Sequence, residues 1–114
     1  MVTDQVGNPA WCRMLAEITA QILALGNKHI REHTGLYHLA DSGFVSRFDW
    51  AKLVLELDPD KIQQTLKEII PALTADYPTP AQRPLFSALE CTLFLATFGL
   101  QLPDWESVLR LALK

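Results

Sequence analysis

The residues of this sequence best suited to chemistry are three histidines within a short stretch. His29 and His33 lie four positions apart, so a helix places both imidazoles on one face, where they reach one metal ion. His38 is the nearest candidate for a third ligand, together with Asp41. This spacing predicts a site for a divalent transition metal such as zinc, formed by His29, His33 and His38. The alternative is a solvated helix end, where histidines are stabilised by the helix dipole.

The order His29-Ile30-Arg31-Glu32-His33 resembles the signature of the inverted zinc proteases, in which the glutamate acts as general base. The resemblance covers only this motif, and those proteases are far larger chains. A catalytic zinc also requires a third protein ligand and a substrate cleft. We therefore set the protease aside and keep the plain metal site as an alternative to the solvated helix end, which we favour.

The remaining polar residues offer no catalytic set. Glu90 lies in the most apolar stretch, but Ser87, Glu90 and Thr97 form a polar stripe that can touch water. Cys12 and Cys91 share no motif spacing, and we expect reduced thiols in an apolar core. The glycines stand singly, so no glycine-rich loop is present to cradle a phosphate. These observations predict a protein that is not an enzyme and carries no cofactor.

The charge balance argues against nucleic acid as a partner. Asp and Glu number 13 against 10 Lys and Arg, a net charge of −3, whereas phosphate binding depends on clustered basic residues. The segment 36–53 fits the helix-turn-helix pattern poorly and offers only Arg47 and Lys52 to DNA. A nucleic-acid-associated small subunit is therefore the lesser alternative.

Helix signals dominate the chain, and no alternating strand pattern or hairpin turn is found. Caps and apolar spacing predict helices over 9–25 with a continuation toward Gly35, 46–57, 59–73 with a kink or end at Pro71, 85–98, and 103–114. The fold class predicted is all-α, a compact bundle of about five helices in a single domain, 1–114. We expect a flexible N-terminus at 1–8 and a proline-rich turn at 76–84, and we make no prediction for 35–46.

The chain is unusually apolar for its length. Hydrophobic residues make up 49% and charged residues 20%, with a mean hydropathy of +0.11. A short chain cannot hide all this surface in one core, so an exposed apolar patch is expected, and such patches mark interfaces. On the final helix, Trp105, Leu109 and Leu113 recur every four residues and form one ridge. The sequence thus favours a non-catalytic protein (a small subunit, adaptor or inhibitor) that binds another protein or a second copy of itself.

We expect this protein in the cytoplasm. The stretch 85–98 is too short to span a bilayer, and no export signal is visible at the N-terminus. The two cysteines carry no disulfide pattern, which agrees with a reducing compartment.

Overall fold

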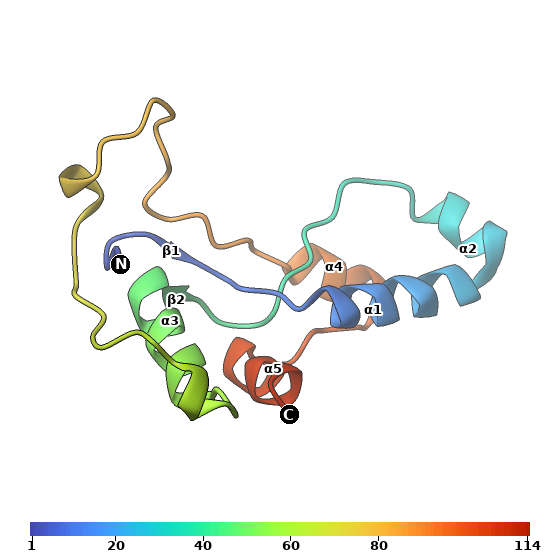
Figure 1. Ribbon diagram of the computed structural model, residues 1–114. Helices are drawn as coiled ribbons and strands as arrows, with labels where there is room; N and C mark the ends of the chain where they lie inside the picture. Colours follow the sequence, from blue (N-terminus) through green and yellow to red (C-terminus); the bar gives the residue numbers. More distant parts are fainter.

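The computed structural model describes residues 1–114 as five short helices and one two-stranded sheet, joined by long extended segments (Figure 1). The helices are α1 (Cys12–Ala24), α2 (Gly26–Glu32), α3 (Arg47–Leu57), α4 (Thr92–Phe98) and α5 (Trp105–Ala112), and the strands are β1 (Val6–Gly7) and β2 (Val45–Ser46). Two short 3-10 turns, Lys61–Gln63 and Thr74–Asp76, lie in the long connection between α3 and α4.

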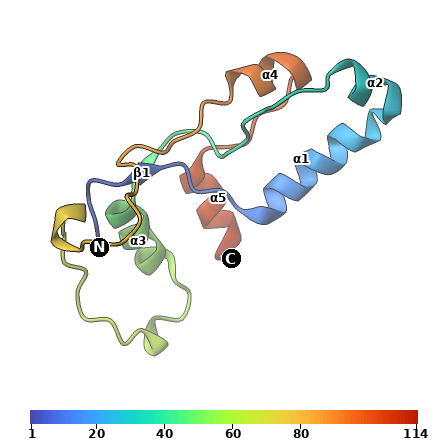
Figure 2. The same cartoon turned by 90° about the horizontal axis from the view of Figure 1, so that it is seen from above.

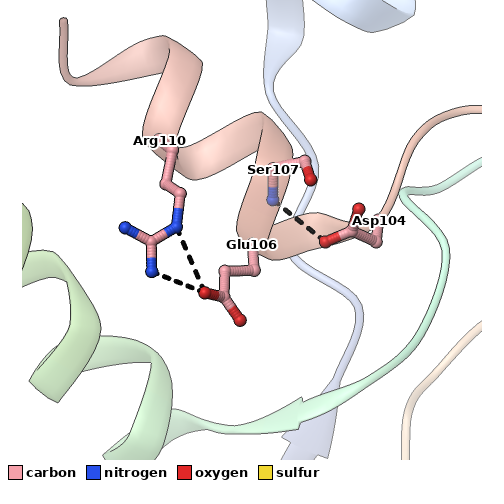
Figure 3. Close-up of polar contacts among 4 residues, drawn as sticks. All are labelled: Asp104, Glu106, Ser107 and Arg110. Atoms are coloured by element: carbon pink, nitrogen blue, oxygen red, sulfur yellow. Dashed lines mark hydrogen bonds and ion pairs between the residues drawn. The ribbon is translucent and has the colours of Figure 1, made fainter.

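Two helices begin at side-chain caps, close to the starts of the predicted ranges 46–57 and 103–114. Ser46 is the N-cap of α3, and Asp104 is the N-cap of α5. The Asp104 carboxylate accepts a hydrogen bond from the Ser107 backbone N–H at 3.0 Å, and Arg110 pairs with Glu106 at 2.6 Å one turn later (Figure 3). Each cap satisfies a backbone donor that the first helical turn leaves unpaired.

The expected continuation of the first helix is interrupted. Helix α1 ends at Ala24 and α2 begins at Gly26, whose φ of +88° lies in the left-handed region. Glycine adopts this conformation without the steric cost that a Cβ would bring. The chain therefore changes direction between α1 and α2 (Figure 2).

The segment 59–73, predicted as a helix, is extended apart from one 3-10 turn. Pro71 has no N–H to donate, and the next residue pairs with the N-terminus instead. The Thr3 N–H donates to the Ala72 carbonyl at 2.9 Å, and the Ala72 N–H donates to the Met1 carbonyl at 3.0 Å. The prediction was wrong; at the end of the predicted helix this long-range pairing takes the backbone groups of Ala72 that a helix would use.

The helix predicted over 85–98 begins only at Thr92. The Val6 N–H donates to the Leu85 carbonyl at 2.7 Å, and the Ser87 N–H donates to the Val6 carbonyl at 2.9 Å. These two bonds form a parallel bridge, so the first part of the predicted helix is strand-like.

Residues 1–8, expected to be a flexible terminus, are hydrogen-bonded to three other segments. Strand β1 pairs antiparallel with β2, Val6 opposite Ser46 and Gly7 opposite Val45. Parallel bridges join Val2 to Ala72 and Val6 to Phe86. The N-terminal segment therefore lies between α3 and the long connection that precedes α4 (Figures 1 and 2).

The predicted compact all-α bundle is wrong. Extended segments pair as strands around residues 1–8, and the fully buried core cluster is only Ile18, Phe94 and Leu102. Only 7 of 114 residues are buried, and the radius of gyration is 17.3 Å. A compact domain of this length has a radius of gyration of about 13 Å. The molecule is an open α/β arrangement with many apolar side chains at its surface.

No helix of the structure has both the length and the apolar character needed to cross a membrane.

Both cysteines are free thiols; Cys12 is exposed and Cys91 half-buried, so neither is the buried core residue that we expected.

Candidate functional site

The most polar large hollow lies where three segments meet: residues 5–9, the start of α3, and residues 83–89. Its volume is about 550 Å³, within the range of small-molecule sites. Side chains with polar atoms or aromatic faces dominate its lining, among them Asn8, Ser46, Arg47, Trp50, Arg83 and Ser87.

Two wall segments of this hollow are fixed to each other by Asn8. Its side-chain amide donates to the Leu89 carbonyl at 3.1 Å, and its side-chain oxygen accepts from the Leu89 N–H at 3.0 Å. Beside them, a Cβ at Gly7 would lie 3.3 Å from the Ser87 hydroxyl oxygen. Glycine therefore allows the close approach that brings residues 83–89 to β1.

Helix α3 enters the hollow with its N-terminal end already hydrogen-bonded. The Arg47 N–H donates to the Gln5 carbonyl and the Phe48 N–H to the Val2 carbonyl, both at 3.0 Å. The next free donor, the Asp49 N–H, donates to the Ser46 hydroxyl. A ligand here is therefore held by side chains rather than by the helix backbone.

The electrostatics of the hollow suit an anion. Arg47 and Arg83 both line it, and the lining contains no carboxylate. Guanidinium groups bind phosphate oxygens in pairs of parallel hydrogen bonds. The lining also contains no histidine, cysteine, lysine or tyrosine, so it supplies binding and orientation rather than a group for proton transfer.

The predicted metal ligands do not come together. The rings of His29 and His33 are stacked with centroids 4.1 Å apart, and both lie against Phe98. The Nδ1 atom of His33 is 2.9 Å from the His29 carbonyl oxygen. No group of three or more His, Cys, Asp or Glu side chains is placed to hold a metal ion. The expected set of His29, His33 and His38 is therefore not assembled, because stacking and a backbone bond use the first two rings.

The ridge on α5 is partly turned toward its own chain. Trp105, Leu109 and Leu113 are each half-buried, and Val108 is the buried residue of the helix. A Cβ at Gly43 would lie 3.4 Å from the Trp105 ring, so this indole packs on the loop before β2.

Glu90 is exposed, and hydrogen bonds from the Thr92 hydroxyl and N–H lower its pKa.

The sequence predicts no hollow here. It offers Arg47 only as a DNA contact and predicts no role for Arg83 or Trp50. One signal was present: Arg83 is the only charged residue between positions 77 and 89, and it stands beside Pro84.

Mixed strand and helix pairing around a hollow lined by two arginines defines an α/β domain with a hollow whose electrostatics suit an anion. Comparison with known families gives a more particular answer. The model of the RmlD substrate binding domain matches residues 1–114, and the chain belongs to this family.

Similar proteins are enzymes of one name. The dTDP-4-dehydrorhamnose reductase of Escherichia coli K12 is 38% identical over 108 residues, which cover 93% of this chain and 36% of that protein. A crystal structure of a dTDP-4-dehydrorhamnose reductase from Clostridium acetobutylicum aligns with a TM-score of 0.77 at 27% identity, covering 96% of this chain and 35% of that one. The reductase from Bacillus anthracis, solved in complex with NADP, aligns with a TM-score of 0.76 at 24% identity, over 95% of this chain and 34% of that one. The chain thus spans about a third of the length of the relatives it matches.

These findings overturn the function inferred from the sequence. The relatives are reductases, so the prediction of a non-catalytic adaptor, subunit or inhibitor is wrong, as are the metal-binding and nucleic-acid alternatives. The prediction that the protein is not an enzyme is contradicted by the same names. The expectation of no cofactor, or of zinc, is contradicted by the reductase relatives, one of which was solved in complex with NADP.

The residues of this chain do not themselves fit NADP. The pyrophosphate of a dinucleotide is held by a glycine-rich turn between a parallel strand and a helix. The glycines here are single, and both strands are two residues long and antiparallel.

Proposed function

We propose that this chain is the substrate-binding part of a dTDP-4-dehydrorhamnose reductase, and that its cationic hollow binds the diphosphate of the nucleotide sugar. One observation carries the proposal: Arg47 and Arg83 line the same hollow, which contains no carboxylate. The name shared by the relatives supports it, since a thymidine diphosphate sugar brings a diphosphate to its site.

In this proposal the chain binds and orients the substrate. Arg47 and Arg83 neutralise the diphosphate, the Asn8 and Ser87 side chains lie at the wall opposite α3, and Trp50 offers an aromatic face. NADP supplies the hydride when bound to such a reductase. Fixing the diphosphate also orients the sugar attached to it. Holding a reactant in one orientation removes much of the entropic barrier to its reaction.

The same proposal accounts for the apolar surface. Large side chains such as Leu36, Leu93 and Leu111 are more than half exposed, which a free-standing domain avoids. We propose that the part of the reductase beyond this chain covers them, with the α5 ridge of Trp105, Leu109 and Leu113 at its margin. We also propose a cytoplasmic location, where nucleotide sugars and free thiols coexist.

The binding step is tested by calorimetric titration of the chain with inorganic pyrophosphate. We expect saturable binding that weakens as salt is raised, and a loss of roughly tenfold or more in affinity for Arg83→Gln and for Arg47→Gln. Arg13→Gln is the matched control, because Arg13 lies on α1, outside the hollow, with its side chain 69% exposed. Equal binding by all four proteins would contradict the proposed site.

The enzymatic step is tested by exchange. The segment of the Escherichia coli reductase that aligns with this chain is replaced by residues 1–114, and reduction of dTDP-4-dehydrorhamnose is followed by the consumption of NADPH. We expect activity that falls sharply when the inserted segment carries Arg83→Gln. A folded chimera that binds NADP yet lacks activity with the intact segment would argue against the assignment.

A further inference from the structure

The imidazole rings of His29 and His33 form a stacked pair that the proposed function does not use. The two ring planes are inclined by 26°, with centroids 4.1 Å apart. The ring centroid of Phe98 on α4 lies 6.2 Å from that of His29 and 6.0 Å from that of His33. The pair therefore packs α2, and the residue that ends it, against α4.

The nitrogen atoms of this pair suit neutral rings. The Nδ1 atom of His33 lies 2.9 Å from the His29 carbonyl oxygen, so this nitrogen carries the hydrogen and donates it. The Nε2 atom of His29 is buried and has no hydrogen-bond partner. An imidazolium donates from both ring nitrogens, so protonation of His29 would leave a charged N–H group buried and unpaired.

A second cost arises if both rings take a proton. Two imidazolium ions in this stack would repel each other across 4.1 Å. No carboxylate offsets the repulsion, because neither ring takes part in an ion pair. Stacking of the two rings is therefore compatible with the neutral forms and opposed by the doubly charged one.

The titratable groups on the surrounding elements do not change this balance. Helix α4 carries none. The Tyr37 hydroxyl donates to the His33 carbonyl at 2.8 Å, and the exposed His38 interacts with Glu90 instead. The charged side chains of α1 and α2 are exposed: Arg13 paired with Glu17, Lys28 paired with Glu32, and Arg31.

Helix α2 is joined to α1 by a glycine that can act as a hinge. It forms one end of the molecule, and none of its residues is fully buried (Figures 1 and 2). Gly26 has a φ of +88°, and a Cβ there would meet no atom within 4 Å, so no packing fixes the joint. The histidine pair at the other end of α2 is thus the contact that holds it in place.

We propose that the stack of His29 and His33 is a pH-sensitive switch, which holds α2 on α4 while both rings are neutral and releases it about Gly26 when they are protonated. Imidazole is the side chain that changes its charge between about pH 5 and 8. The closed state binds fewer protons than the released one, so the contact is complete at the upper end of this range and is lost as pH falls. Release uncovers Phe98 and Tyr37, which pack against the core cluster.

The test is amide hydrogen exchange of the 114-residue chain at pH 7.5 and at pH 5.0, with rates corrected for the intrinsic effect of pH on exchange. We expect the protection of the amides of residues 29–33 to fall roughly tenfold or more at pH 5.0. The amides of α5 should keep their protection, which separates local release of α2 from unfolding of the whole chain.

His29→Phe tests the role of the stack. Phenylalanine keeps a ring in the stack but takes no proton, and its apolar edge suits the place where Nε2 has no partner. We expect this variant to keep α2 protected at pH 5.0. His38→Phe is the matched control, because His38 is exposed and lies outside the stack, and it should lose protection as the unaltered chain does.

The unaltered chain alone can overturn the switch. Equal protection of residues 29–33 at the two pH values does so, and so does a loss of the same size in α5. The ring proton resonances of Phe98 give a second measurement without any variant, and the switch fails if they stay constant over this pH range. Release that persists in His29→Phe would assign the pH dependence to another group. Neither histidine lines the cationic hollow, so each of these results leaves the diphosphate proposal to its own test.

Discussion

The Asp4 carboxylate accepts two kinds of hydrogen bond from Thr74, which lies 70 positions later in the chain. The backbone N–H of Thr74 donates to it at 3.0 Å and the Thr74 hydroxyl at 2.8 Å. The Gln5 side chain in turn donates to the same hydroxyl oxygen at 3.0 Å. These bonds fix residues 1–5 against the 3-10 turn Thr74–Asp76.

Asp4→Asn should lower the stability of the chain at neutral pH and make no difference in strong acid. Hydrogen bonds from the Thr74 hydroxyl and N–H hold the pKa of Asp4 below its usual value. A carboxyl whose folded pKa is lowered stabilises the fold above its unfolded pKa of 3.8, and that contribution is lost as pH falls through the folded pKa. Urea unfolding at pH 7 and at pH 2 measures the difference.

Asp60→Asn is the matched control, since no hydrogen bond to the Asp60 side chain is found in the structure. We expect its unfolding midpoint to follow that of the unaltered chain at both pH values. Equal midpoints for the Asp4 and Asp60 variants at pH 7 would show that the contact with Thr74 does not stabilise the fold.

Removal of metal should leave this protein unchanged. The His29 and His33 rings stack on each other, and no third ligand is near them. A chelator should therefore leave the thermal midpoint unaltered, and elemental analysis should find no stoichiometric zinc. A rise in midpoint with one equivalent of zinc that disappears in the double variant His29→Ala, His33→Ala would contradict this prediction.

The small core makes stability sensitive to one leucine. Leu102 is 2% exposed and belongs to the core cluster with Ile18 and Phe94. Leu102→Ala should lower the free energy of unfolding by about 2–5 kcal/mol, the usual cost of truncating a buried leucine. Leu36→Ala, at a side chain 84% exposed, should change it by less than about 0.5 kcal/mol. Comparable losses in the two variants would mean that Leu36 is covered in solution.

Some local signals in the sequence predicted the conformation correctly, but the expected helix start at position 9 was early: α1 begins at Cys12, and the Asn8 side chain bonds to Leu89. The N-caps Ser46 and Asp104 start helices, and Gly99, with φ +66°, ends α4. The failures lie at 59–73 and 85–91, where apolar spacing fits a helix but the backbone at Ala72 and at 85–89 pairs with residues 1–8. Pairing between segments so distant in sequence leaves no periodic spacing of apolar residues that would reveal it in either segment.

The candidate site was missed for a related reason. Arg47 and Arg83 are far apart in sequence and meet only because β1 pairs with both β2 and the segment before α4. The apolar surplus was recognised, but it was assigned to a small binding protein. In our proposal the same surplus is the surface that the remainder of the reductase covers, since the chain matches about a third of its relatives' length.

Asp41 is a buried carboxyl group without a compensating charge. It is 2% exposed, its Oδ1 atom has no hydrogen-bond partner, and burial raises its pKa to about 6. The Trp11 backbone N–H opposes this shift, and the Asp104 carboxylate adds to it. Because the proton is bound more tightly in the folded chain, the contribution of Asp41 to stability is complete below pH 3.8 and is lost as pH rises through about 6.

Asp41→Asn should therefore remove a pH dependence rather than simply shift the stability. Between pH 4 and pH 7 the unaltered chain should lose up to about 3 kcal/mol of unfolding free energy at this group, from a pKa difference of about two units. The free energy of unfolding of the variant should fall less over the same range. The variant should therefore gain stability relative to the unaltered chain as pH rises. Urea unfolding at intervals of half a pH unit measures this, with Asp60→Asn as an exposed control. Parallel curves for Asp41→Asn and the unaltered chain would show that Asp41 is ionised in the folded state without cost, which requires a donor at its Oδ1 atom.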